Sequence, residues 1–161
     1  MSASETFRND IPGVIAPPPL VFACFLILGV ASDRHFLGGF SYLPEVLRYV
    51  LAPALVLAAL VFLAGALGGF RSARTRAEPW KPTTAIVTGG VYRFTRNPMY
   101  LGMALAYAGI ALAMDSVAAL ALLVPAVLVN QHGVILREER YLEAKFGGEY
   151  LRYKTRVRRW L

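Results

Sequence analysis

The chain has 161 residues, of which 57% are hydrophobic and 17% are charged. Soluble domains carry about 25% charged residues, so this composition excludes a disordered chain, a secreted disulfide scaffold and a typical water-soluble enzyme. The 17 Lys and Arg residues outnumber the 10 Asp and Glu residues, which gives a net charge of +7. In so apolar a chain, this basic balance favours a membrane surface over nucleic acid. We therefore expect one small integral membrane domain spanning residues 1–161.

The first apolar stretch runs over 14–31 and has three consecutive prolines, Pro17–Pro19, near its start. Because proline is tolerated only in the first turn of a helix, we expect the regular helix to begin at or after these residues. The region before the stretch has no net positive charge, which favours a retained span over a cleaved signal peptide. The single cysteine, Cys24, lies in this stretch and excludes an intrachain disulfide.

Three further apolar stretches follow, and a helix of about 20 such residues crosses a bilayer. The stretch 49–70 carries no charge, 99–114 is short, and 117–136 follows it directly. Asp115 and Ser116 leave little room for a turn, so the last two stretches predict a helical hairpin. The expected fold is therefore all-α: a polytopic membrane protein with about four transmembrane helices and a C-terminal amphipathic interfacial helix.

Positive charge is concentrated in two segments, 71–98 and 137–161, which together hold 14 of the 17 basic residues. Four spans place these segments on the same side of the membrane, and the positive-inside rule makes that side the cytoplasm. Both termini are then cytoplasmic. The Ala-, Leu- and Arg-rich composition suggests a bacterium, and hence a bacterial plasma membrane.

The segment 71–98 is more than a linker between two spans. Two prolines exclude a regular helix at Glu78–Pro82, and Thr84–Thr88 is β-branched and extended in character. Gly89-Gly90 then turns the chain. Pro98 suits the first turn of the third helix, with Asn97 as its N-cap. An aromatic belt with positive-inside arginines would explain the Arg and Tyr residues here, but not Asn97 or the paired glycines.

The polar residues Asn130–His132 interrupt the fourth stretch, and we expect them to face the bundle interior or a wet cavity. We assign His132 no role as a base. The apolar spacing in the tail predicts an amphipathic helix over 137–146, and Gly147-Gly148 is expected to end this helix. A helix resumes over 149–157, with two tyrosines, Tyr150 and Tyr153, on one side.

Several chemistries find no support in the sequence. It has no dinucleotide-binding glycine fingerprint after a strand, no P-loop, and no Ser/His/Asp signature. Two histidines distant in sequence and one cysteine make no convincing zinc site, so we expect no metal. The adjacent carboxylates of Glu138 and Glu139, beside an anionic membrane, need arginine partners or a ligand.

Four blocks in order resemble the superfamily of isoprenylcysteine carboxyl methyltransferases and phospholipid methyltransferases. They cover about half of the chain, from Thr84 to Val157, and the first two spans match only as generic apolar segments. The isoprenylcysteine enzymes have His at position 97 and an arginine near position 134. This chain has neither, which argues against a prenylcysteine carboxylate as its substrate. The blocks are 87–92, 96–102, 138–139 and 146–153.

The resemblance implies a small helical membrane enzyme that binds S-adenosylmethionine at the cytoplasmic interface without a Rossmann sheet. The enzyme would transfer a methyl group to a small lipophilic or lipid acceptor, with membrane lipids as its surroundings. If the acceptor is an amine it must lose a proton, which Tyr100, Glu138, Glu139 or water could accept, and the sequence does not select among them. The resemblance places the cofactor contacts at Thr84, Ala85, Ile86, Val87, Tyr92, Asn97, Pro98, Met99, Tyr100, Glu138 and Glu139.

Two other functions stay open on the sequence alone. Sterol reductases resemble this superfamily in their C-terminal helices, so an NADPH-dependent membrane reductase is one alternative. A membrane scaffold without enzymatic activity is the other, and it predicts that Asn97 and Glu138 tolerate alanine. The sequence leaves the acceptor atom (O, N, S or C) and the oligomeric state undetermined.

Overall fold

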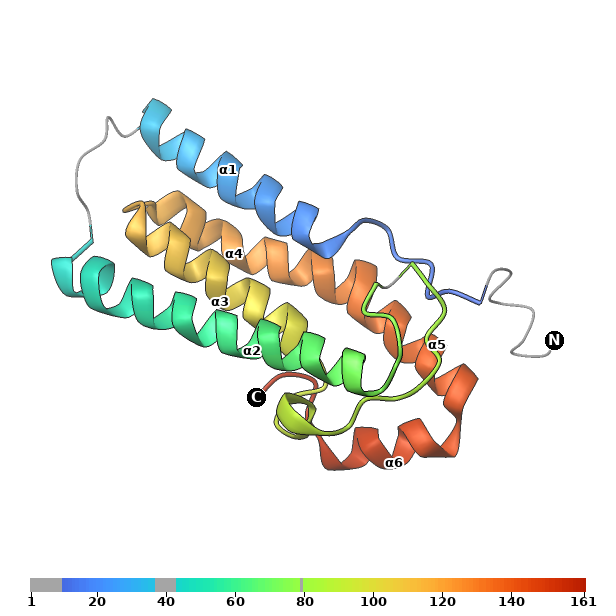
Figure 1. Ribbon diagram of the computed structural model, residues 1–161. Coiled ribbons are helices and arrows are strands. Elements are labelled where there is room, and N and C mark those ends of the chain that lie inside the picture. Colours follow the sequence, from blue (N-terminus) through green and yellow to red (C-terminus); the bar gives the residue numbers. More distant parts are fainter. Residues whose placement is uncertain (1–9, 37–42, 79) are drawn as a thin grey trace.

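The computed structural model describes residues 10–36, 43–78 and 80–161, and these form an all-helical bundle (Figure 1). Residues 1–9, which enter the expectation about a signal peptide, lie outside the described part. The elements in chain order are α1 (Pro18–Phe36), η2 (Leu47–Leu51), α2 (Ala52–Ser72), η3 (Gly90–Arg93), α3 (Pro98–Ala113), α4 (Val117–Asn130), η4 (Gln131–Ile135), α5 (Leu136–Phe146) and α6 (Gly148–Arg156).

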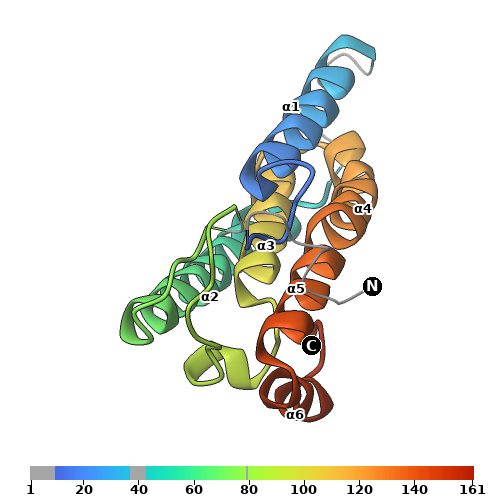
Figure 2. The same ribbon diagram turned by 90° about the vertical axis from the view of Figure 1, so that its right-hand side faces the viewer.

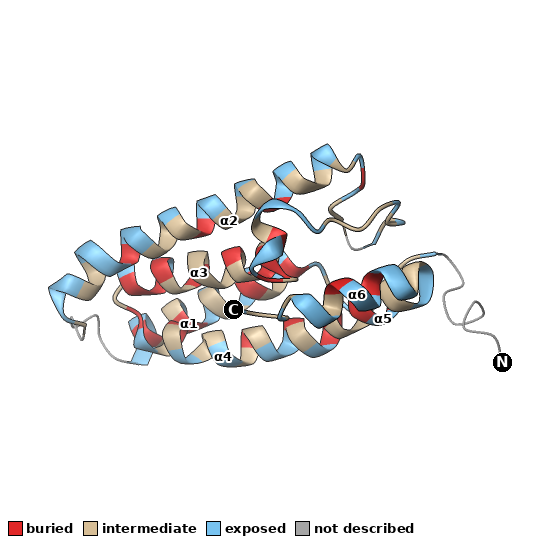
Figure 3. Ribbon diagram, turned by 90° about the horizontal axis from the view of Figure 1, so that it is seen from below, coloured by how far each residue is buried: buried red, intermediate tan, exposed pale blue. Residues whose placement is uncertain are grey.

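Among the described residues, three helices are long and apolar enough to cross a membrane: Pro18–Phe36, Leu47–Ser72 and the continuous helix Val117–Phe146. The shorter apolar helix α3 has only 16 residues and rises about 24 Å, against a hydrocarbon core of about 30 Å. The chain is therefore a polytopic membrane protein, as its composition predicts. Figure 3 shows exposed residues along the outside of α2, and three of these, Leu57, Leu60 and Val61, are apolar as a lipid-facing surface requires.

The helices pack as two pairs, α2 with α3 and α1 with α4, and the predicted α3–α4 hairpin joins the pairs (Figure 1). Glycine allows the close approaches. A Cβ on Gly29 of α1 would lie 2.4 Å from the Cα of Ala119, and one on Gly109 of α3 would lie 2.9 Å from the Ala52 carbonyl oxygen. Small residues at helix crossings are typical of membrane bundles, where dispersion contacts replace the hydrophobic effect.

The α3–α4 turn is fastened to α1 at one end of the bundle. Ser116 is the N-cap of α4, and its hydroxyl accepts a hydrogen bond from the Ala119 N–H at 3.1 Å. The buried Asp33 of α1 accepts hydrogen bonds from the Ser116 hydroxyl and, at 3.0 Å, from the Ala118 N–H. This contact anchors α1 to the start of α4 and lies far along the bundle from the site described below.

At the other end the last long helix continues past the bundle. Its 30 residues rise about 45 Å, which exceeds the hydrocarbon core, so about 20 residues from Val117 suffice to cross it. The charged helix α5 then projects beyond the span, and α6 folds back beside it (Figure 2). Gly147 makes this turn with φ +52°, so the tail forms two packed helices that are separated at the predicted Gly147-Gly148 break.

Candidate active site

A cavity opens at this end of the bundle, where the 71–98 segment, the start of α3, α5 and α6 meet. The empty space between its walls, with the solvent at its open mouth included, is about 800 Å³. Segments far apart in sequence thus converge on one hollow. The predicted residues that line it are Ala85, Ile86, Val87, Tyr92, Asn97, Pro98, Met99, Tyr100, Glu138 and Glu139.

Thr84 is the one predicted residue that does not line the cavity. It is exposed, its N–H donates to the hydroxyl of Thr75 at 2.9 Å, and its neighbour Thr83 lines the cavity instead. The Thr83 N–H donates to the hydroxyl of Tyr141 on α5 at 3.2 Å. The loop is irregular, as its prolines predict. The Thr84 hydrogen bond closes the loop onto its own first residues, and the Thr83 hydrogen bond ties it to α5.

Glycines on α2 let the cavity loop dock closely. A Cβ on Gly69 would lie 2.9 Å from the Cγ1 of Val87 and 3.2 Å from the ring of Tyr92. One on Gly65 would lie 2.6 Å from the Cγ1 of Val91. The Tyr92 ring also packs edge-on against Phe70, with 5.7 Å between ring centroids. The end of α2 therefore forms the seat on which Val87 and Tyr92 are placed.

The start of α3 forms a second wall. Asn97 is the N-cap and Pro98 the first helical residue, as the sequence predicts, but the Asn97 side chain makes no capping hydrogen bond. Its amide instead donates to the carbonyl of Arg159 at 3.0 Å, because the C-terminal residues lie beside it. The side chain predicted as a cap thus holds the C-terminal segment.

The third wall of the cavity is formed by α5, and a hydrogen bond joins this wall to α3. The hydroxyl of Tyr100 donates a hydrogen bond to the carboxylate of Glu138 at 2.9 Å. Desolvation in the cavity wall raises the pKa of Glu138 to about 7, with the Glu139 charge adding to the rise and the Tyr100 hydrogen bond opposing it. Burial also raises the pKa of Tyr92 and of Tyr153, so both phenols stay neutral at physiological pH. Because its pKa is raised to about 7, Glu138 can exchange a proton near neutral pH, which is what a general base requires.

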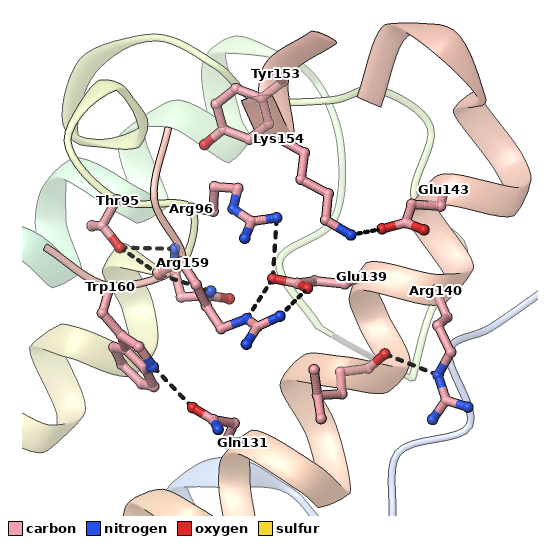
Figure 4. Close-up of polar contacts among 12 residues, drawn as sticks. Thr95, Arg96, Gln131, Glu139, Arg140, Glu143, Tyr153, Lys154, Arg159 and Trp160 are labelled. Carbon is pink, nitrogen blue, oxygen red and sulfur yellow. Dashed lines mark hydrogen bonds and ion pairs between the residues drawn. The ribbon is translucent and has the colours of Figure 1, made fainter. Parts of the chain in front are cut away.

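The neighbouring Glu139 has a different environment (Figure 4). Arg159 donates to both carboxylate oxygens, at 2.9 Å from Nε and 2.8 Å from Nη2. Arg96 pairs with the same carboxylate at 3.2 Å. The Glu139 side chain is only 6% exposed. Of the two adjacent carboxylates, Glu139 is thus engaged by arginines and Glu138 is left to the cavity.

A π-helical turn, η4 (Gln131–Ile135), explains how α5 presents both carboxylates. Its wider turn inserts a residue into the helix and rotates α5 relative to α4, and such turns occur frequently at functional sites. Asn130 just before it is buried, as predicted, whereas His132 is exposed and bonds the Leu128 carbonyl. Within the described residues no group of His, Cys, Asp and Glu side chains could hold a metal.

Four further residues that line the cavity were not predicted as cofactor contacts. Arg96, Tyr150 and Tyr153 lie in the motif blocks 96–102 and 146–153, and Tyr141 is predicted only as part of the amphipathic tail. The hydroxyl of Tyr153 donates to the Tyr92 carbonyl at 2.8 Å, which closes the cavity floor. Helical spacing predicts that Tyr150 and Tyr153 share a face, but only the folded-back α6 shows that this face looks inward.

Comparison with known proteins supports the resemblance seen in the motifs. The sequence model of the phospholipid methyltransferase family matches residues 47–149, which is more than half of the chain. An uncharacterized protein of Haemophilus influenzae is 53% identical over 47 residues, which are 29% of this chain and 73% of that protein. No solved structure is significantly similar to the chain. The match over residues 47–149 includes most of the cavity, and the chain belongs to the phospholipid methyltransferase family.

Proposed function

We propose that the protein transfers a methyl group from S-adenosylmethionine to a lipophilic or lipid acceptor at the membrane interface. The observation that carries this proposal is the Tyr100–Glu138 hydrogen bond inside the cavity. It joins two of the family motifs in a chain that belongs to the phospholipid methyltransferase family. Membership of that family suggests lipid methylation with this cofactor.

The chemistry of the cavity fits the cofactor. Apolar and aromatic side chains such as Ile86, Tyr92 and Met99 suit an adenine ring and a thioether chain. Three carboxylates line the cavity, and two of them have cationic partners: Lys81 pairs with Glu78, and arginines pair with Glu139. The third, Glu138, is bonded to the Tyr100 hydroxyl, and a carboxylate so placed suits ribose hydroxyls or an ammonium group. When bound, the cofactor supplies an electrophilic methyl group on a sulfonium.

Methyl transfer to a nucleophile is a problem of alignment, which needs no metal. In this proposal the loop 85–87 and the start of α3 hold the cofactor, and Tyr100 fixes the direction of the Glu138 carboxylate. Glu138 has a pKa of about 7 and would accept the proton of an amine or hydroxyl acceptor. Of the three candidate bases, Glu139 is the least suited because its oxygens are already bonded to arginines.

The position of the cavity suits two reactants of opposite polarity. It lies where the apolar bundle ends and the basic segments begin, so a polar cofactor can arrive from water and the acceptor from the bilayer. Basic side chains attract anionic headgroups. We propose that this end faces the cytoplasm of a bacterial plasma membrane, because Lys and Arg gather there.

The experiment supplies purified protein with methyl-labelled S-adenosylmethionine and a total bacterial lipid extract, and measures the label in the lipid phase. We expect transfer with the wild type and at least about a tenfold loss with Glu138→Gln. The control Glu149→Gln changes an exposed carboxylate outside the cavity and should leave transfer unchanged. No labelled lipid from folded protein that binds the cofactor would refute a lipid acceptor.

A further inference from the structure

The C-terminal strap, residues 157–161, lies against the start of α3. The backbone carbonyl of Arg158 accepts a hydrogen bond from the Arg96 N–H at 2.9 Å. The carbonyl of Arg159 accepts two more, from the Thr95 hydroxyl at 2.9 Å and the Asn97 amide at 3.0 Å. The strap thus bonds each of three consecutive residues that lead into the cavity wall at Pro98.

A side-chain latch fastens the strap to α5. The guanidinium of Arg159 makes a two-point contact with Glu139, and Arg96 pairs with that carboxylate from the α3 side (Figure 4). Glu139 therefore ties the strap, the start of α3 and α5 together. Paired charges in this geometry are directional, so the latch fixes where these segments lie relative to one another.

Trp160, the aromatic residue of the strap, packs near the Tyr100–Glu138 hydrogen bond. Trp160 packs against the cluster that contains Tyr100 and Val134. Its indole N–H donates to the Gln131 side chain of η4 at 3.0 Å (Figure 4). Tyr100, a member of this cluster, in turn donates to Glu138, so the cluster links the strap to that carboxylate.

We propose that the strap positions the cofactor cradle, with Arg159 as the positioning residue that latches it. This rests on the proposed function, since the cradle is the one proposed for S-adenosylmethionine. Arg159 does not line the cavity and acts through Thr95, Asn97 and Glu139. When the latch is removed, the Asn97 amide loses its fixed acceptor and Tyr100 loses its backing, so cofactor affinity falls although no cavity side chain has changed.

The test needs a variant that releases the strap without breaking the fold. Arg159→Met leaves Glu139 paired with Arg96, which avoids an unpaired buried carboxylate. The matched control is Arg158→Met, since that side chain is exposed and the substitution removes the same charge. The chain has two tryptophans, and a Trp80→Phe background makes Trp160 the only reporter of strap docking.

Two quantities are measured in each variant: the emission and acrylamide quenching of Trp160, and the dissociation constant of S-adenosylhomocysteine. For Arg159→Met we expect red-shifted, more quenchable emission and affinity about tenfold weaker. Arg158→Met should match the background in both. Arg159→Lys keeps the charge but loses the two-point contact. Its Trp160 emission and its affinity for S-adenosylhomocysteine should therefore lie between those of Arg159→Met and those of the background protein.

Thr95→Val is a second variant at a residue outside the cavity lining: it removes a strap hydrogen bond and, with it, the acceptor of the Asn97 N–H. It should weaken binding and shift the Trp160 emission in the same direction. Released Trp160 with unchanged affinity would overturn the positioning role, and docked Trp160 in Arg159→Met would overturn the latch. A folded background protein that binds no S-adenosylhomocysteine would overturn the proposed function and the strap proposal with it.

Discussion

Replacing Gly69 by alanine tests whether the end of α2 is the seat of the cavity loop. An added Cβ would lie 2.9 Å from the Cγ1 of Val87 and 3.2 Å from the Tyr92 ring. A Cβ added to the neighbouring Gly68 would have nothing within 4 Å, so Gly68→Ala is a control on the same helical turn. The pair separates the effect of helix propensity from the effect of crowding the loop.

The two substitutions should differ in sign. Gly→Ala inside a helix stabilises by about 0.5–1 kcal/mol, and Gly68→Ala should show this gain. In Gly69→Ala the same gain is opposed by overpacking, which costs about 1–3 kcal/mol. We therefore expect a net loss of up to about 2.5 kcal/mol, with Val87 and Tyr92 moving away from α2.

The assay pairs thermal unfolding in detergent with titration of S-adenosylhomocysteine. Because Val87 and Tyr92 line the cavity, their displacement should weaken binding by about tenfold in Gly69→Ala. Gly68→Ala should bind as the wild type does. Equal stability and equal affinity in the two variants would refute the close docking of the loop on α2.

Three further predictions concern the carboxylates and the tail. Burial raises the pKa of Glu138 from 4.5 to about 7, so the folded protein should lose stability as the pH rises from 4.5 to 7. Unfolding midpoints measured between pH 4.5 and 8 should show this fall in the wild type and not in Glu138→Gln. Asp33→Ala removes the acceptor of the Ser116 and Ala118 hydrogen bonds. It should lower stability by about 1–3 kcal/mol but leave cofactor affinity unchanged in the same titration; weakened binding would contradict the separation of the two ends. Gly147 has φ +52°, so Gly147→Ala should cost about 1–3 kcal/mol in strain, and an unchanged unfolding midpoint would count against that turn.

The helices were predictable from the sequence wherever apolar length and punctuation residues act locally. Pro98 begins α3, Ser116 caps α4, and Gly147 separates α5 from α6, as their backbone preferences require. The first helix begins at Pro18 but extends to Phe36, past the predicted end at residue 31, because polar residues such as Asp33 find partners on α4. Hydropathy alone does not reveal such partners.

The cavity was predictable as a set of motifs but not as a set of contacts. The motif positions place ten of eleven residues on the cavity wall, although their roles as ligands stay predictions. The different environments of Glu138 and Glu139 could not be predicted, because they depend on Arg96 and Arg159, which come from distant segments. The π-turn before α5, which presents both carboxylates to the cavity, has no local sequence signal.

The proposed function can be tested by titrating the purified 161-residue chain, in mild detergent, with S-adenosylmethionine and separately with NADPH. We predict saturable binding of S-adenosylmethionine, no binding of NADPH, and affinity that falls at least about tenfold in Glu138→Gln. The exposed-site variant Glu149→Gln should bind as the wild type does. Folded protein that binds NADPH and not S-adenosylmethionine would contradict the proposed function and favour a reductase, and folded protein that binds neither would favour a scaffold.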